Sequence, residues 1–170
     1  MKTYEFSLVY ALPRSDARAE SYLDALFEAG CDDAVVGVAV PGRIGLSFMR
    51  QAASAGAAIR SAMKDVRKAI PKAVLIEAGP DLVNLSEIAA AAEMTRQNIQ
   101  KYATGKIRTV TVPFTPPVVT GSPSLYRLCE VGTWLQTHAK VKLKDHLLEI
   151  SRLTAQLNLR TQKERLASLL

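Results

Sequence analysis

Apolar and polar positions near the start of the chain repeat first with a period typical of a strand and then with one typical of a helix. Residues 4–12 begin with polar and apolar side chains in alternation and are rich in aromatic and branched residues, which predicts a strand. Apolar residues then recur at spacings of three and four after Ser15 and Asp16, either of which can cap a helix, and Gly30 can end it. A strand followed by an amphipathic helix is therefore predicted.

A hairpin and a second helix follow. Residues 34–40 and 43–50 flank the Pro-Gly pair at 41–42, which is a typical turn. Ser54 can cap a helix that has small and branched apolar residues on one side and basic residues on the other, and a strand at 73–77 comes next. The pattern predicts two further strands, a helix and a final strand.

The resulting order βαββαβ is the split-βαβ, or ferredoxin-like, arrangement, in which an antiparallel sheet has both helices on one face. We therefore expect the α+β class, with a ferredoxin-like domain over residues 1–79. Because this arrangement occurs in ligand sensors, dimerisation modules, RNA-binding proteins and enzymes, it does not indicate one function.

Two short helices are predicted next, at 85–92 and 95–104. The first has an apolar face and a run of alanines that allows a close crossing, and Thr95 can cap the second. A crossing as tight as this is typical of a DNA-binding helix pair, although it also occurs in ordinary protein cores. The polar residues expected to point outward from the second helix are Arg96, Gln97, Gln100 and Lys101.

The rest of the chain predicts an extended segment and two more helices. Residues 107–114 are extended, turn residues follow, and 124–127 can return as a second strand. Those two segments predict a two-stranded wing. Helices are expected at 129–137 and at about 142–168.

Charge is distributed unevenly along the chain, whose formal net charge is +6. Residues 95–144 contain eight basic side chains and one acidic side chain, Glu130. Such a concentration is typical of a protein with a polyanionic partner, although a solvated basic face would look the same.

Beyond these patterns, the segment 82–137 resembles a known family. Leu85-Ser86-Glu87-Ile88-Ala89, then Met94-Thr95-Arg96-Gln97-Asn98-Ile99, and then Leu125-Tyr126-Arg127 before Val131 and Trp134-Leu135 are similar to the winged helix-turn-helix of MerR-like and excisionase-like bacterial DNA-binding proteins. The chain departs from the family pattern at Met94, where a Gly-Val turn is common, in its long wing at 106–124, and in placing the motif after another domain.

The resemblance implies that the second helix enters the major groove and that the wing reaches the flanking backbone or the minor groove. The implied contacts are Thr95, Arg96, Gln97, Gln100 and Lys101 from the helix, Lys106 and Arg108 from the wing, and Tyr126 and Arg127 to phosphates. The expected domains are the ferredoxin-like one, a winged helix-turn-helix at 80–139, and a C-terminal helix at 140–170 for dimerisation or packing.

Three functions are compatible with these features. We expect sequence-specific binding to double-stranded DNA by a homodimer, as in a bacterial or phage transcriptional regulator. One alternative is a DNA-bending architectural or recombination-directionality factor. Another is a regulatory module in which residues 1–79 bind a small-molecule effector or a protein, with DNA binding secondary.

Few other residues point to chemistry. Cys31 and Cys129 are far apart and fit no metal-binding or disulfide pattern. The sequence contains no catalytic constellation and no cofactor or metal motif, so neither an enzyme nor a cofactor is expected. It also contains no apolar run of membrane-spanning length and no signal-peptide pattern, which predicts a cytoplasmic protein.

Overall fold

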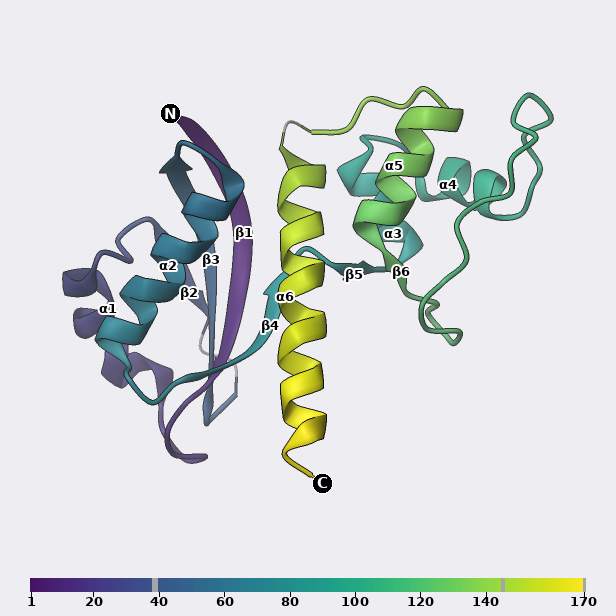
Figure 1. The fold of residues 1–170 in the computed structure, drawn as a ribbon. Coiled ribbons are helices and arrows are strands. Elements are labelled where there is room, and N and C mark those ends of the chain that lie inside the picture. The colour runs from purple at the N-terminus through teal and green to yellow at the C-terminus, as the bar shows by residue number, and fades with distance from the viewer. Residues whose placement is uncertain (38–39, 145, 170) are drawn as a thin grey trace. The chain divides into compact units, whose positions relative to one another are not determined.

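The computed structural model describes residues 1–37, 40–144 and 146–169. It belongs to the α+β class and divides into two compact units, which are described separately (Figure 1). The first unit comprises Met1–Gly79 and Gln156–Leu170, and the second comprises Pro80–Ala155. The predicted hairpin positions Val38 and Ala39, and position Asp145 of the predicted last helix, lie outside the described residues.

The first unit has the predicted βαββαβ order. Its four strands form one sheet in the order β2-β3-β1-β4, and each neighbouring pair is antiparallel. A 3-10 turn at Ala19–Tyr22 precedes the first helix. The elements are β1 (Lys2–Ala11), α1 (Leu23–Ala29), β2 (Ala34–Gly37), β3 (Arg43–Ala52), α2 (Ala55–Ala69) and β4 (Val74–Gly79).

One face of this sheet forms the core of the first unit. The alternate residues of β1 and β3 on that face are buried, and Phe6 stacks on its cross-strand partner Phe48 with ring centroids 5.1 Å apart. Helices α1 and α2 pack against each other beside this face (Figure 1). The residues of the opposite face are exposed, as Glu5 and Met49 are, or only half-buried, as the period-2 pattern requires.

Of the helix ends predicted for the first unit, two are confirmed and one is wrong. Ser54 caps α2 by accepting a hydrogen bond from the Ala57 N–H at 3.2 Å, and Gly30 ends α1 at a φ of 106°. The predicted cap by Ser15 or Asp16 is wrong, because no side chain caps α1 and the carboxylate of Asp16 accepts two hydrogen bonds from Arg14 instead.

The outer edge of β4 is covered by the last helix, α6 (Leu147–Ala167), which begins at Leu147 instead of near residue 142. The buried side chain of Asn158 donates to the Ala78 carbonyl at 2.8 Å and accepts from the Ala78 N–H at 2.7 Å. The amide thus bonds the edge N–H and C=O of Ala78, as a neighbouring strand would. Unbonded edge groups would be able to pair with another chain.

The second unit is mainly helical. It also includes the beginning of α6, as far as Ala155. Strands β5 and β6 form an antiparallel pair with Val83 opposite Tyr126. The elements are β5 (Leu82–Val83), α3 (Leu85–Ala91), α4 (Arg96–Ala103), β6 (Tyr126–Arg127) and α5 (Leu128–His138).

The predicted two-stranded wing is wrong. Residues 105–125, called the long loop below, contain no strand, and their one described bridge joins Val119 to Leu125. The prolines at 113, 116 and 117 cannot donate ladder hydrogen bonds. In addition, the Pro113 carbonyl accepts a 2.7 Å hydrogen bond from the Trp134 indole, and Phe114 packs edge-to-face on that ring. The loop is therefore held by the core of the second unit instead of by a strand partner.

Candidate nucleic-acid interface

Helices α3 and α4 form the predicted tight pair. Asn84 caps α3 in a capping box, since its side chain accepts from the Glu87 N–H at 3.0 Å while the Glu87 carboxylate accepts from the Asn84 N–H at 2.7 Å. Ile88 and Ala89 of α3 and Ile99 of α4 are buried in one apolar core. This core fixes the orientation of α4 within the unit.

The turn between the two helices has a left-handed residue at Glu93, with a φ of 52°. The Met94 N–H donates to the Ala89 carbonyl at 2.9 Å, and the Glu93 N–H donates to the Ala90 carbonyl at 3.3 Å. These two bonds form a Schellman motif, in which the left-handed position usually holds glycine. Glutamate therefore keeps the turn closed at a cost in backbone energy.

Changing Glu93→Gly should stabilise the second unit by about 0.5–1 kcal/mol, because glycine adopts the left-handed conformation without the Cβ penalty. Urea unfolding followed by Trp134 fluorescence measures this change, since Trp134 is the only tryptophan and lies in this unit. Glu93→Ala is the matched control, because it removes the same charge but keeps a Cβ. Equal stability of the glycine and alanine variants would contradict the explanation.

Helix α4 presents a polar outer face. Thr95 caps the helix by accepting from the Asn98 N–H at 3.2 Å, as predicted. Four further polar side chains of the helix are exposed, and none of them forms a hydrogen bond or ion pair with the residues that the structure describes. They are Arg96, Gln97, Gln100 and Lys101. All four are thus available to an external partner.

The two basic residues predicted on the wing lie just after α4. Gly105 turns the chain at a φ of 68°, and the Lys106 N–H donates to the Lys101 carbonyl at 2.8 Å, so Lys106 follows directly on the end of α4. Arg108 lies in the next turn of the long loop, and both side chains are exposed. They extend the basic surface of α4 along the chain.

Tyr126 and Arg127, the predicted phosphate contacts, have different surroundings. Tyr126 is buried, with its ring edge-to-face on Phe114. Arg127 forms an ion pair with Asp81 at 2.6 Å, and the two side chains are only 14% and 5% exposed. Arg127 is therefore engaged within the unit. Its partner Asp81 had no marker in the sequence, because it stands 46 positions away.

Basic side chains dominate the exposed charge of residues 95–144. Of the eight basic residues, all except Arg127 are exposed, and the single acidic residue is Glu130. The exposed ones are Arg96, Lys101, Lys106, Arg108, Lys140, Lys142 and Lys144. This excess of exposed positive charge in the segment favours a polyanionic partner.

A groove lies beside α4 in the second unit and has a volume of about 380 Å³. Arg96 and Gln100 line it from α4, and Tyr126 lines it from β6. The remaining walls come from the start of α3 and from the long loop, namely Asn84, Leu85, Ser86, Gly121, Ser122, Pro123 and Ser124. The three serines had no marker in the sequence, because only folding brings the loop to α3.

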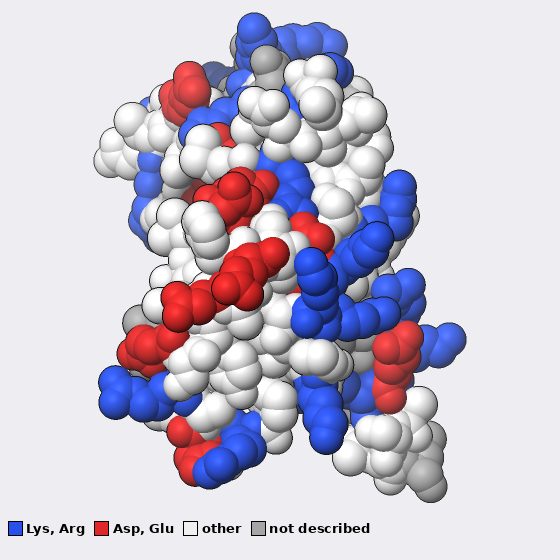
Figure 2. All heavy atoms as spheres, turned by 90° about the vertical axis from the view of Figure 1, so that its left-hand side faces the viewer, with Lys and Arg blue, Asp and Glu red and all other residues white. Residues whose placement is uncertain are grey.

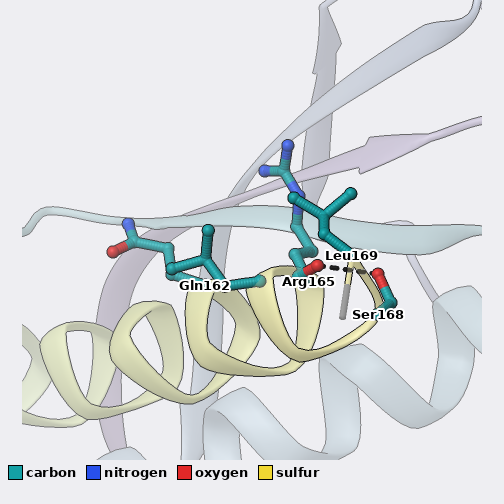
Figure 3. A pocket seen from close by; sticks show the side chains of 5 residues that line it. Gln162, Arg165, Ser168 and Leu169 are labelled. Carbon is teal, nitrogen blue, oxygen red and sulfur yellow. Dashed lines mark hydrogen bonds between the residues drawn. The ribbon is translucent and has the colours of Figure 1, made fainter.

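Another hollow, of about 440 Å³, lies at the end of α6 in the first unit (Figure 3). Figure 3 shows Gln162, Arg165 and Leu169 around it, with the Ser168 hydroxyl donating to the Arg165 carbonyl at 2.7 Å. Its polar side chains come from one helix end and do not converge on a common point. The groove beside α4 is therefore the better candidate site.

Arg50 is the most extensively bonded charged residue of the first unit. Its guanidinium donates to Asp33 at two positions, both at 2.8 Å, to Asp65 at 2.7 Å and to the Gly30 carbonyl at 2.7 Å. It also lies over the Phe48 ring, 5.0 Å from the centroid. All of these partners belong to the unit itself, so the cluster stabilises the fold.

The cysteines are poorly suited to nucleophilic chemistry. Burial raises the pKa of the Cys31 thiol to about 11 and also raises the pKa of Cys129. Both therefore stay protonated at neutral pH, whereas a nucleophile needs the thiolate. Within residues 1–37, 40–144 and 146–169, no group of three or more His, Cys, Asp or Glu side chains is placed to hold a metal ion.

Among the described residues, no helix combines the length and the apolar character needed to cross a bilayer. No protein-family model, curated protein or solved structure matches this chain.

Proposed function

We propose that this chain binds double-stranded DNA sequence-specifically and acts as a transcriptional regulator. The observation that supports this most strongly is the polar surface of α4, where Arg96, Gln97, Gln100 and Lys101 are exposed and not engaged by other described residues. A capped helix with such a face fits the major groove of DNA, which is wide enough to admit an α-helix. The surrounding excess of exposed Lys and Arg supports the same partner.

In this proposal the second unit is a helix-turn-helix, with α3 as the supporting helix and α4 as the recognition helix. Lysine can bond guanine O6 and N7, and glutamine can bond adenine N6 and N7. Lys106 and Arg108 of the long loop contact the DNA backbone beside the major groove, the role that the resemblance gave to a wing. These phosphate contacts would supply most of the sequence-independent affinity.

The first unit and α6 supply the dimer in this proposal. Its βαββαβ order and its strand order β2-β3-β1-β4 support a ferredoxin-like arrangement. A two-fold dimer would place two copies of α4 about 34 Å apart, one turn of the double helix. The half-sites of the DNA sequence would then be related by the same two-fold axis.

The function is tested by selecting duplexes from a random pool with the full chain, then measuring Kd for the selected and the scrambled duplex at two salt concentrations. We expect a preference of at least about 10³-fold that persists at the higher salt concentration, because base contacts depend less on counterion release than phosphate contacts do. As a control, Arg60→Ala with Lys64→Ala removes two exposed charges from α2 of the first unit. Equal affinities for the two duplexes would contradict the proposal.

A second candidate function is suggested by α1, whose Phe27 side chain is 69% exposed and whose Leu23 is 40% exposed. The acidic residues Asp24 and Glu28 are exposed on the same helix. Figure 2 shows the side of the molecule that lies at the left of Figure 1, where a band of acidic side chains runs beside a basic area. An apolar patch flanked by acidic groups suits a basic protein partner, so the first unit would then be a regulatory docking domain.

A photo-crosslinking residue at position 27 tests this candidate in cells that contain the protein. The residue at position 27 should capture one protein partner. The same crosslinking residue placed at position 60, where Arg60 is also exposed, should not capture that partner. Identical products from both positions would contradict a specific docking surface on α1.

A further inference from the structure

The four predicted contact residues within α4, namely Arg96, Gln97, Gln100 and Lys101, do not face the same way. An α-helix turns by about 100° per residue, so directions around α4 can be measured from Ile99, which is fully buried. Gln97 and Lys101 then lie within about 20° of the direction opposite Ile99. Arg96 lies about 60° from Ile99 and Gln100 about 100° from it, both on the same flank of the helix.

That flank borders the groove described above. Arg96 and Gln100 are the two α4 residues that line the groove, while Gln97 and Lys101 do not. The helix geometry and the groove lining thus separate the same two pairs of residues, from independent observations. One pair faces straight outward, and the other faces the long loop and β6.

The groove has the chemistry of a phosphate-binding site. Arg96 provides a guanidinium, while Ser86, Ser122 and Tyr126 provide hydroxyl groups. The neighbouring carboxylate of Glu87 is already bonded to the Asn84 N–H at 2.7 Å. Phosphate oxygens accept hydrogen bonds from both kinds of donor, and a guanidinium can bind two of them at once.

The loop wall of the groove has a defined shape. The N–H groups of Val118 and Val119 donate to the Leu125 carbonyl at 2.8 and 3.2 Å, and the Leu125 N–H donates to the Val119 carbonyl at 2.9 Å. The Ser124 hydroxyl donates to the Gly121 carbonyl at 3.1 Å. These bonds place the loop serines opposite α4 before any ligand binds.

We propose that this groove holds one phosphodiester of the DNA backbone, with Arg96 as its main contact, and that base recognition belongs to Gln97 and Lys101. The inference rests on the proposed DNA-binding function. It assigns Arg96, one of the implied contacts of the recognition helix, to the DNA backbone, where it sets the register of α4 along the DNA.

Methylphosphonate scanning of the selected duplex tests the proposal. Replacing the one phosphate that enters the groove by a neutral methylphosphonate should weaken wild-type binding about tenfold. The same replacement should not weaken Arg96→Ala further, because the variant has already lost the contact. Arg96→Ala should also lower the salt dependence of log Kd by about one and weaken selected and scrambled duplexes equally.

Lys101→Ala is the matched control, since it removes the same charge from the outward face. It should remain sensitive to the methylphosphonate that no longer affects Arg96→Ala. Tyr126→Phe removes only a hydroxyl group from the groove and leaves the charge unchanged. It should lower the affinity for the selected and the scrambled duplex equally, which would support the assignment.

Specific binding in which Arg96→Ala and every methylphosphonate act additively would overturn the groove assignment and leave the proposed function intact. A changed base preference for Arg96→Ala, with an unaltered salt dependence, would do the same. If the wild-type chain prefers no duplex sequence at all, the proposed function and this inference both fail.

Discussion

Replacing both Gln97 and Lys101 by alanine is expected to lower the affinity for the selected DNA sequence about 100-fold. Each side chain that bonds a base edge with two hydrogen bonds contributes about 1–3 kcal/mol to discrimination, and about 2.7 kcal/mol corresponds to 100-fold. Binding to a scrambled duplex should fall much less, since only one phosphate-compatible charge is lost. Fluorescence anisotropy with both duplexes measures the two effects.

The control for the Gln97 and Lys101 variant removes one glutamine and one positive charge from the first unit. Gln51→Ala with Arg60→Ala changes one exposed glutamine and one exposed cation outside the proposed interface. It should leave the preference for the selected duplex unchanged. If the Gln97 and Lys101 variant keeps its affinity for the selected duplex within twofold, α4 is not the recognition helix.

Replacing Arg127 by alanine is expected to destabilise the second unit by about 3–5 kcal/mol, because the substitution leaves the buried carboxylate of Asp81 without its cation. Urea unfolding followed by Trp134 fluorescence measures the loss. Arg108→Ala is the control, because it removes the same charge from an exposed position of the long loop. It should leave the unfolding midpoint unchanged and lower the salt dependence of DNA binding.

A double substitution separates a structural role of Arg127 from a phosphate contact. Asp81→Leu combined with Arg127→Met replaces the ion pair by apolar groups and should recover most of the stability. The recovered protein should bind DNA with the wild-type salt dependence. Wild-type stability of Arg127→Ala together with a reduced salt dependence would show that Arg127 contacts phosphate after all.

Both large effects concern residues that a linear motif treats alike. Arg96, Gln97, Lys101 and Arg127 are all polar residues of one basic segment. Folding gives them three different surroundings, namely an outward helix face, the side of a groove and a buried ion pair. A substitution at each position should therefore change a different measured quantity.

Local patterns predicted much of the secondary structure. The helix cap at Thr95, the cap at Ser54 and the left-handed stop at Gly30 agree with the structure, because each depends on one side chain and the three or four residues next to it. The departure from the family pattern at Met94 lies next to Glu93, which adopts a conformation that favours glycine.

Pairings between distant segments were not predictable in the same way. The segment 124–127 has a strand pattern, but that pattern does not say which segment it pairs with. Tyr126–Arg127 pairs with Leu82–Val83. The long loop offers no strand partner, because its prolines lack N–H donors and its Phe114 packs on Trp134. The predicted wing failed for this reason.

The sequence by itself determined the α+β class, the order of strands and helices in the first unit, and the polar outer face of α4, because period, caps and turn residues act over a few positions. Only the tertiary structure decided that Arg127 pairs with Asp81, that Asn158 covers the edge of β4, and that Ser86 and the long loop form a groove beside Arg96. These features join residues that are far apart in the chain. Asp81 and Asn158 are buried, so their polar groups depend on a partner that only folding supplies.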